Sequence, residues 1–222
     1  MDLTKHLEFF NPIVMEDTIH IIGVGAIGSN IAETLARLGL TNIHIYDFDV
    51  VSKHNVANQT YFDDQIDKPK VECIAETMRR INPNISVIIH DKGWSTGTRL
   101  SGYVFLAVDN IEIRKQIVKE NKYNTAIKAM FDFRMGLEDA QHYACEWSSQ
   151  KNIDNFYASM DFTHEEAKEA TPISACGTTL SVLTTIRVIV SSGISNFINL
   201  VKGKKLKTMI IANAFSFNYM TF

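Results

Sequence analysis

The chain has 222 residues, of which 45% are hydrophobic and 21% are charged, and its formal net charge is −3. This apolar content is enough for one large core, and the length favours a single domain, which we assign to residues 1–222. The slightly acidic balance provides no basic surface of the kind that nucleic-acid binding requires.

The sequence gives no indication of a secretory signal or a membrane anchor. Acidic residues stand on both sides of the short apolar patch near the N-terminus, and no small-residue cleavage site follows it. The most apolar late stretch, residues 180–201, includes Arg187, Gly193 and several hydroxyl side chains. A membrane-spanning helix needs about 20 mostly apolar residues. We therefore predict a buried or interface helix there, and no membrane contact.

Strands alternate with helices along the first 134 residues, a pattern that predicts an α/β fold with a Rossmann-like, mainly parallel sheet. β-branched and aliphatic runs indicate the strands, and apolar residues at helical spacing indicate the helices. A helix at 71–81 is expected to have Asp67 as its N-cap and Pro69 near its first turn. In chain order, the expected elements are strand 18–22, helix 27–38, strand 42–46, helix 71–81, strands 85–90 and 103–108, helix 111–120 and strand 126–131.

The pattern is weaker after Arg134. It predicts a strand at 141–147, an irregular polar loop at 152–172, a late crossing helix at 178–200 and a terminal strand at 209–217. Apolar residues recur every four positions along the late helix, and such a stripe must be buried, either in a dimer interface or against the sheet of its own subunit. The stripe consists of Val182, Ile186, Val190, Ile194 and Ile198.

A glycine motif lies directly between the first predicted strand and the helix that follows. Gly23 permits a tight turn, Gly25 lets backbone N–H groups approach a phosphate, and Gly28 allows the helix to pack closely on the strand. The N-terminus of the helix adds a partial positive charge for an anion. Asp47 ends the second strand about 20 residues further on, the spacing at which an acid accepts hydrogen bonds from ribose hydroxyls.

The glycine motif alone does not distinguish a dinucleotide from ATP, but the block after Asp47 does. A nicotinamide enzyme requires only the first acid and has no need of a second acid, an amide pair and a lysine at the start of the next helix. This block therefore favours ATP. Its polar residues are Asp49, Asn55, Asn58, Gln59 and Lys70.

Together these motifs resemble the ThiF/MoeB branch of the ubiquitin-activating-enzyme superfamily. The family pattern runs GxGxxGS, LxRxG, DxDxVxxxNxxRQ, a lysine opening a helix that ends in INP, and a strand ending in Asp-Asn with an arginine after it. The match is dense from Ile21 to Arg114 and loose afterwards. The matching residues outside the glycine motif are Ser29, 35–39, Asp47, Asp49, Asn55, Gln59, Lys70, 81–83, Asp109, Asn110 and Arg114.

The resemblance implies an adenylyltransferase that uses ATP and Mg²⁺. Asp47 would hold the ribose, Asn55 and Lys70 the phosphates and Asp109 the metal, with Arg37 and Gln59 supporting the pocket. Lys70, Asp109 and Cys176 are the expected catalytic residues. The expected nucleotide-binding set is Gly23, Gly25, Gly28, Asp47, Asp49, Asn55, Asn58, Gln59, Lys70, Asp109 and Asn110.

The implied substrate is the C-terminal carboxylate of a small ubiquitin-like or sulfur-carrier-like protein or a peptide. A C-terminal carboxyl has a pKa near 3.3, so it is already ionised at neutral pH and needs no general base. The family usually forms dimers across its nucleotide sites, and we therefore expect a homodimer or a heterodimer.

Two departures from the family pattern leave alternatives open. Asn58 stands where the family has an arginine, and no arginine precedes Arg37, although members often receive one from a partner's N-terminal segment. Arg114 or Arg134 could compensate, while Arg134 is equally consistent with a surface charge. The alternatives are a nucleotide-binding but inactive half of a heterodimer or, from the glycine turn alone, an NAD(P)-dependent oxidoreductase.

Cys176 precedes the late helix, at the point where family members with thioester or persulfide chemistry place a cysteine. A helix N-terminus lowers the pKa of a thiol and favours the thiolate. The alternative is a small packing residue. The other two cysteines, Cys73 and Cys145, are expected in the core. Because CxxC pairs are absent, we expect no zinc-binding subdomain, and a reduced, cytoplasmic compartment is the default expectation.

Overall fold

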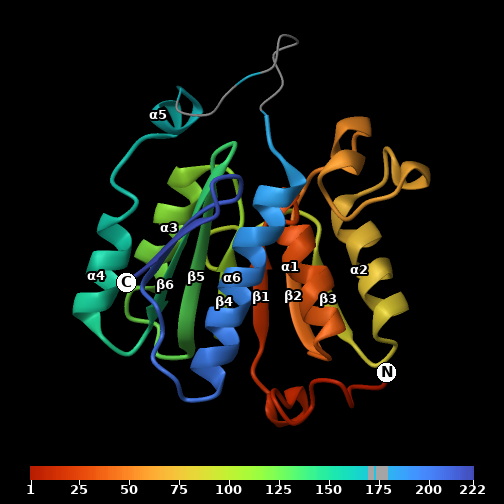
Figure 1. Cartoon of the computed structure of the whole chain (residues 1–222), viewed down its shortest axis with the longest axis horizontal. Helices are drawn as coiled ribbons and strands as arrows, with labels where there is room; N and C mark the ends of the chain where they lie inside the picture. The colour runs from red at the N-terminus through yellow and green to blue at the C-terminus, as the bar shows by residue number, and fades with distance from the viewer. Residues whose placement is uncertain (170–172, 174–179) are drawn as a thin grey trace.

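The protein is built around one eight-stranded sheet, seen in a computed structural model that describes residues 1–169, 173 and 180–222 (Figure 1). The strand order is β3-β2-β1-β4-β5-β6-β7-β8. The first five strands in that order are parallel, and β5 to β8 pair antiparallel. The strands are β1 (Ile19–Ile22), β2 (Asn42–Tyr46), β3 (Ser86–His90), β4 (Gly102–Leu106), β5 (Ile127–Met135), β6 (Asp139–Glu146), β7 (Met209–Asn213) and β8 (Asn218–Thr221).

Helices cover both faces of the sheet, with α1, α2 and α6 on one face and α3 and α4 on the other (Figure 1). On the α6 face, Phe197 packs edge-on against Phe105 and Phe131. The helices are α1 (Ala26–Arg37), α2 (Lys70–Ile81), α3 (Ile111–Asn121), α4 (Gln150–Ala158), α5 (His164–Glu169) and α6 (Leu183–Val201). Short 3-10 turns are η1 (Pro12–Val14), η2 (Lys53–Ala57) and η3 (Asp63–Gln65).

The sheet reverses its winding direction between β1 and β4. The chain runs outward from β1 through β2 to β3 and then returns to place β4 on the other side of β1. In open α/β sheets, ligands bind in the crevice outside the carboxyl ends of the two strands at this point. The turns after Ile22 and Leu106 therefore define the place where a site is expected.

The predicted fold class is confirmed, and the predicted strands and helices up to residue 121 agree with the structure to within two residues at each end. The N-cap prediction was wrong: Asp67 has a φ of 67°, and Pro69 occupies the N-cap position of α2. The loop predicted at 152–172 was also wrong, because α4 and α5 occupy much of it. Helix α4 was missed because only Ile153 and Phe156 are buried on it, too few for a periodic signal.

The C-terminal predictions need two corrections. The strand expected at 209–217 is a hairpin in which β7 pairs with β8. The apolar stripe of the late helix lies largely against its own subunit: Ile186, Val190 and Ile194 are buried in the core shared with the sheet. The alternative of burial within the subunit is the one observed. No helix among the described residues is long and apolar enough to span a membrane.

Three histidines lie side by side on one face of β1, β2 and β3. The ring centroids of His20 and His44 are 4.8 Å apart, and those of His44 and His90 are 5.3 Å apart. The His20 ring bonds the Tyr46 hydroxyl at 2.9 Å and accepts the N–H of Ser101 at 3.3 Å. Burial, followed by the charges of the other two histidines, lowers the pKa of His20 to about 3. Burial also lowers the pKa values of His44 and His90.

These histidines predict a loss of stability in mild acid. The unfolded chain takes up protons on histidine near pH 6.5, whereas folded His20 stays neutral down to about pH 3. The free energy of unfolding should therefore be at its full value above pH 6.5 and fall as the pH drops toward 3, by about 1.4 kcal/mol for His20 alone at pH 5.5. Urea titrations at pH 7.5 and 5.5 measure this. In His20→Asn the free energy of unfolding should differ less between the two pH values than in the wild type, whereas the exposed control His54→Asn should behave like the wild type. The same difference in both variants would contradict the role given to His20.

Candidate functional site

The glycine turn after β1 packs against the backbone that follows β4. Gly23 has a φ of +90°, and a Cβ added there would lie 2.7 Å from the Val108 amide nitrogen. A Cβ on Gly28 would overlap the carbonyl oxygen of Gly23. At Gly25, in contrast, no atom lies within 4 Å of the added Cβ. Gly23 and Gly28 are therefore required by close packing, while Gly25 faces open space.

Helix α1 begins at this open space with its backbone donors uncapped. The first hydrogen bond of its first turn runs from the Ser29 N–H to the Gly25 carbonyl at 3.0 Å, and no side chain caps the helix. The leading N–H groups of a helix have no intrahelical acceptors and carry the positive end of the helix dipole. The turn thus presents an anion-binding surface at the carboxyl edge of the sheet.

Asp47 fixes the glycine turn and still has acceptor capacity left. Its two carboxylate oxygens accept the Val24 N–H at 2.8 Å and the Asp49 N–H at 2.9 Å. An ionised carboxylate has about four lone-pair sites, and the side chain is only partly buried. It can therefore hold the turn and accept bonds from a diol at the same time.

Lys70 lies beside this acidic strand end. Its ammonium is 2.8 Å from the Asp49 carboxylate, and its backbone N–H donates to the Asp49 carbonyl at 2.9 Å. The lysine is 7% exposed, whereas the Asp49 side chain is 52% exposed. The structure thus brings the start of α2 to the end of β2 and places a nearly buried cation there, balanced by one carboxylate.

A polar turn after η2 lies against the first turn of α1. The Thr60 N–H donates to the Ser29 hydroxyl at 3.1 Å, and the Asn58 amide donates to the Ser181 hydroxyl. In the described structure, the side-chain oxygens of Asn58, Gln59 and Thr60 are buried and have no partner. Buried polar atoms are normally hydrogen-bonded, so this turn is a place where donors from water or a ligand are needed.

Asn55 and Asn110 are both used as caps. The Asn55 side chain accepts the N–H and the hydroxyl of Ser52, each at 2.9 Å, and so closes η2. The Asn110 side chain accepts the N–H groups of Glu112 and Ile113 and caps α3. Their amide nitrogens are the groups that remain for a ligand.

Asp109 is exposed, and it has no hydrogen-bonding or ionic partner among the described residues. It follows β4, whose turn is tied to β1 by the bond from the Ala107 N–H to the Ile22 carbonyl at 2.8 Å. Its carboxylate is therefore available at the switch point. The described residues contain no cluster of three His, Cys, Asp or Glu side chains that could hold a metal alone.

Of four further residues named at the sequence level, one lies away from the turn, two lie in the core as expected, and one cannot be placed. Arg37 was expected to support the pocket, but it ends α1, about 16 Å along the helix from the glycine turn. There it pairs with Glu33 at 2.7 Å, with 63% of its side chain exposed. The predictions for Cys73 and Cys145 are confirmed: both are buried, and burial raises the pKa of Cys145 to about 12. Cys176 lies outside the described residues.

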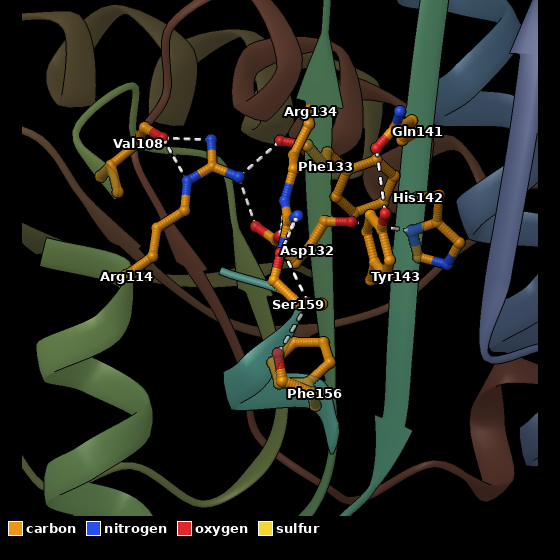
Figure 2. A network of polar contacts seen from close by, with 10 residues as sticks. All are labelled: Val108, Arg114, Asp132, Phe133, Arg134, Gln141, His142, Tyr143, Phe156 and Ser159. Carbon is orange, nitrogen blue, oxygen red and sulfur yellow. Dashed lines mark hydrogen bonds and ion pairs between the residues drawn. The ribbon is translucent and has the colours of Figure 1, made fainter. Parts of the chain in front are cut away.

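Arg114 and Arg134 are both committed to one buried carboxylate (Figure 2). Asp132 is fully buried and pairs with Arg114 through one oxygen and with Arg134 through the other, the second pair at 2.6 Å. Arg114 also donates to the Val108 carbonyl at 2.7 Å, and Arg134 donates to the Ser159 carbonyl at 2.6 Å. Neither guanidinium replaces the missing family arginine, and Arg134 is not a surface charge.

This network predicts a large stability loss for Asp132→Ala. The substitution leaves two buried guanidinium groups without their counter-charge, and breaking a buried pair costs about 3–5 kcal/mol. Urea unfolding followed by circular dichroism measures the change. Asp17→Ala removes the carboxylate of the more exposed Lys128 pair and should cost at most about 1 kcal/mol. Similar losses in both variants would contradict this account of the network.

Sequence reasoning missed Tyr61. Its side chain is 3% exposed, and its hydroxyl donates to the Val24 carbonyl at 2.6 Å. The sequence pattern gave no signal for this bond, because it joins residues 37 positions apart and only the fold brings them together.

The sheet order and the glycine turn are those of the Rossmann-like class of α/β proteins. A sequence model of the ThiF family matches residues 14–222. The chain belongs to the ThiF family.

Two relatives are similar over part of their length. Ubiquitin-like modifier-activating enzyme 5 of Caenorhabditis elegans is 26% identical over 137 residues, which are 62% of this chain and 31% of that protein. Molybdopterin-synthase adenylyltransferase of Escherichia coli K12 is 30% identical over 122 residues, 52% of this chain and 49% of that protein. The chain therefore matches about a third to a half of the length of these relatives.

Solved structures share the fold. The crystal structure of PaaA has a TM-score of 0.70 at 15% identity, covering 93% of this chain and 64% of that one. The crystal structure of E. coli MccB with ATP has a TM-score of 0.69 at 16% identity, covering 93% and 63%.

The open space at Gly25 gives a direct test of the anion site. Gly25→Ala should keep the native packing, because the new methyl meets no atom, and should lose about 1–3 kcal/mol of stability, because a φ of −73° with a ψ of −143° lies outside the regions that L-residues favour. It should also weaken the binding of a phosphate-bearing ligand such as ATP at least about tenfold, since the methyl occupies the approach to the turn. Thermal unfolding and titration calorimetry measure the two effects. Gly28→Ala is the matched contrast and should destabilise the protein more strongly; unchanged ATP affinity in Gly25→Ala would refute the assignment.

Proposed function

We propose that this chain is an ATP-dependent adenylyltransferase that activates a carboxylate. The observation that carries the proposal is the open, uncapped turn at Gly25 beside Asp47 and Lys70, at the switch point of the sheet. The turn offers donors for phosphates, Asp47 offers acceptors for the ribose, and Lys70 offers a buried positive charge. A nicotinamide cofactor would use the first two and leave Lys70 and Asp109 without a role.

The residues fit the chemistry of nucleotidyl transfer. The attacking carboxylate joins the α-phosphorus of ATP, and pyrophosphate leaves with the electrons of the broken P–O bond. Lys70 would stabilise the charge on the phosphates, and positioning with preorganised charge would supply most of the acceleration. Asp109, an exposed carboxylate with no partner among the described residues, would hold Mg²⁺ together with phosphates and water. The bound ion would supply further positive charge to the triphosphate.

The relatives suggest the class of acceptor. One is a ubiquitin-like modifier-activating enzyme and another a molybdopterin-synthase adenylyltransferase. We propose a small ubiquitin-like or sulfur-carrier-like protein, or a peptide, that presents its C-terminal carboxylate. Cys176 is the candidate for a later thioester or persulfide step. A homodimer or heterodimer is proposed from the family resemblance alone, since the stripe on α6 is used within the subunit.

A second candidate is a nucleotide-binding but inactive half of a heterodimer. Asn58 replaces the family arginine, and Arg114 and Arg134, which could have compensated, are both tied to Asp132. An amide side chain offers only a neutral N–H donor, whereas a guanidinium is positively charged and can donate two parallel hydrogen bonds to a phosphate. Acceptor-dependent exchange of pyrophosphate into ATP distinguishes the two candidates, because only the active enzyme catalyses it.

Substitutions at three positions test the assignment. Asp47→Ala and Lys70→Ala should each weaken ATP–Mg²⁺ binding roughly 10- to 150-fold, the equivalent of one charge-assisted hydrogen bond. Asp109→Asn should keep ATP affinity within about tenfold and abolish pyrophosphate exchange, because it retains the shape and removes the charge that would hold the metal. Titration calorimetry and isotope exchange are the measurements, with Asp17→Asn as a distant control. Wild-type affinity in both pocket variants would rule out this site.

A further inference from the structure

The Val24 residue of the glycine turn is held at both of its peptide groups. Its N–H donates to the Asp47 carboxylate at 2.8 Å, and its carbonyl accepts the Tyr61 hydroxyl at 2.6 Å. Tyr61 is 3% exposed, so this bond is shielded from water. The Val24 N–H is consumed within the protein and is not available to a ligand.

The bond from Tyr61 determines the direction of the next N–H group. The Val24 carbonyl and the Gly25 N–H belong to one planar peptide, and no described peptide bond is cis. In a trans peptide the carbonyl and the N–H point in opposite directions. With its carbonyl aimed at Tyr61, the peptide therefore points the Gly25 N–H away from Tyr61.

The Gly25 N–H has no acceptor in the described part of the chain, and a Cβ added to Gly25 would meet no atom within 4 Å. Glycine tolerates most backbone conformations, so this peptide could rotate if its carbonyl were free. A rotated peptide would present an oxygen to an incoming phosphate in place of a donor. A fixed carbonyl is thus what keeps the turn attractive to an anion.

Tyr61 is suited to act only as a donor. Burial, followed by the charges of Asp47, Cys73 and Asp49, raises its pKa well above the usual value. The hydroxyl therefore stays protonated at neutral pH, and its hydrogen is directed to the Val24 carbonyl.

We propose that Tyr61 is a positioning residue that orients the Val24–Gly25 peptide so that the Gly25 N–H faces the phosphates of the bound nucleotide. The inference rests on the proposed function, since it requires a phosphate ligand at the turn. Tyr61 acts through the backbone and does not touch the reacting atoms. It makes phosphate binding, but not binding of the base or sugar, depend on one phenol hydroxyl.

The matched pair Tyr61→Phe and Tyr103→Phe tests this. Each removes one hydroxyl from a buried tyrosine, but Tyr103 lies near the start of β4, at the end of the strand away from the turn. Tyr61→Phe should weaken ATP binding about fivefold, the value of one net hydrogen bond, and leave adenosine binding unchanged. Tyr103→Phe should leave both unchanged. An equal loss for ATP and adenosine, or no loss for ATP, would overturn the positioning role.

A second measurement needs no variant. Gly25 is the only glycine in the sequence that follows a valine, so protein labelled with ¹³C-carbonyl valine and ¹⁵N glycine gives a single doubly labelled amide, that of Gly25. Its signal should shift on addition of ATP and not on addition of adenosine, and in Tyr61→Phe the ATP shift should shrink. A Gly25 amide indifferent to bound ATP overturns the inference alone, whereas a wild type that binds no ATP overturns the proposed function as well.

Discussion

The site depends on a backbone-to-backbone contact between the turns that follow β1 and β4. Gly23 lies so close to Ala107 and Val108 that no side chain fits between them, and a side chain on Gly28 would overlap the Gly23 carbonyl. This contact joins the two strands at which the sheet changes direction. The polar groups of the candidate site lie around this contact and form its rim.

The rim is assembled from segments that stabilise one another before any ligand arrives. Asp47 ties the second strand to the glycine turn, and Lys70 ties the start of α2 to the segment after that strand. Arg114 anchors the carbonyl of Val108, and the buried Asp132 holds Arg114 in turn. Lys70, Arg114 and Asp132 are thus paired through short contacts, whereas Asp109 has no partner among the described residues.

The sequence predicted what depends on local order and failed where distant segments meet. The glycine turn, Asp47 and Lys70 follow from spacing along the chain, because a strand, a tight turn and a helix constrain neighbours within one unit. Arg37 fits a motif equally well, yet it lies at the other end of its helix from the turn. The roles of Tyr61 and Arg134 depend on contacts across the fold that no local pattern encodes. Helix α4 has too few buried residues to produce a periodic signal.

The clamping of the glycine turn has a consequence for the thermodynamics of ligand capture. A flexible phosphate loop must lose conformational entropy when it closes on its ligand, which weakens the observed affinity. In the unliganded chain, Asp47 and Tyr61 fix the glycine turn. Ser29 fixes the polar turn that follows η2, through its bond with the Thr60 N–H. That entropy is lost once, on folding. Association should therefore resemble the docking of two rigid bodies, with a rate set by diffusion and orientation rather than by loop closure.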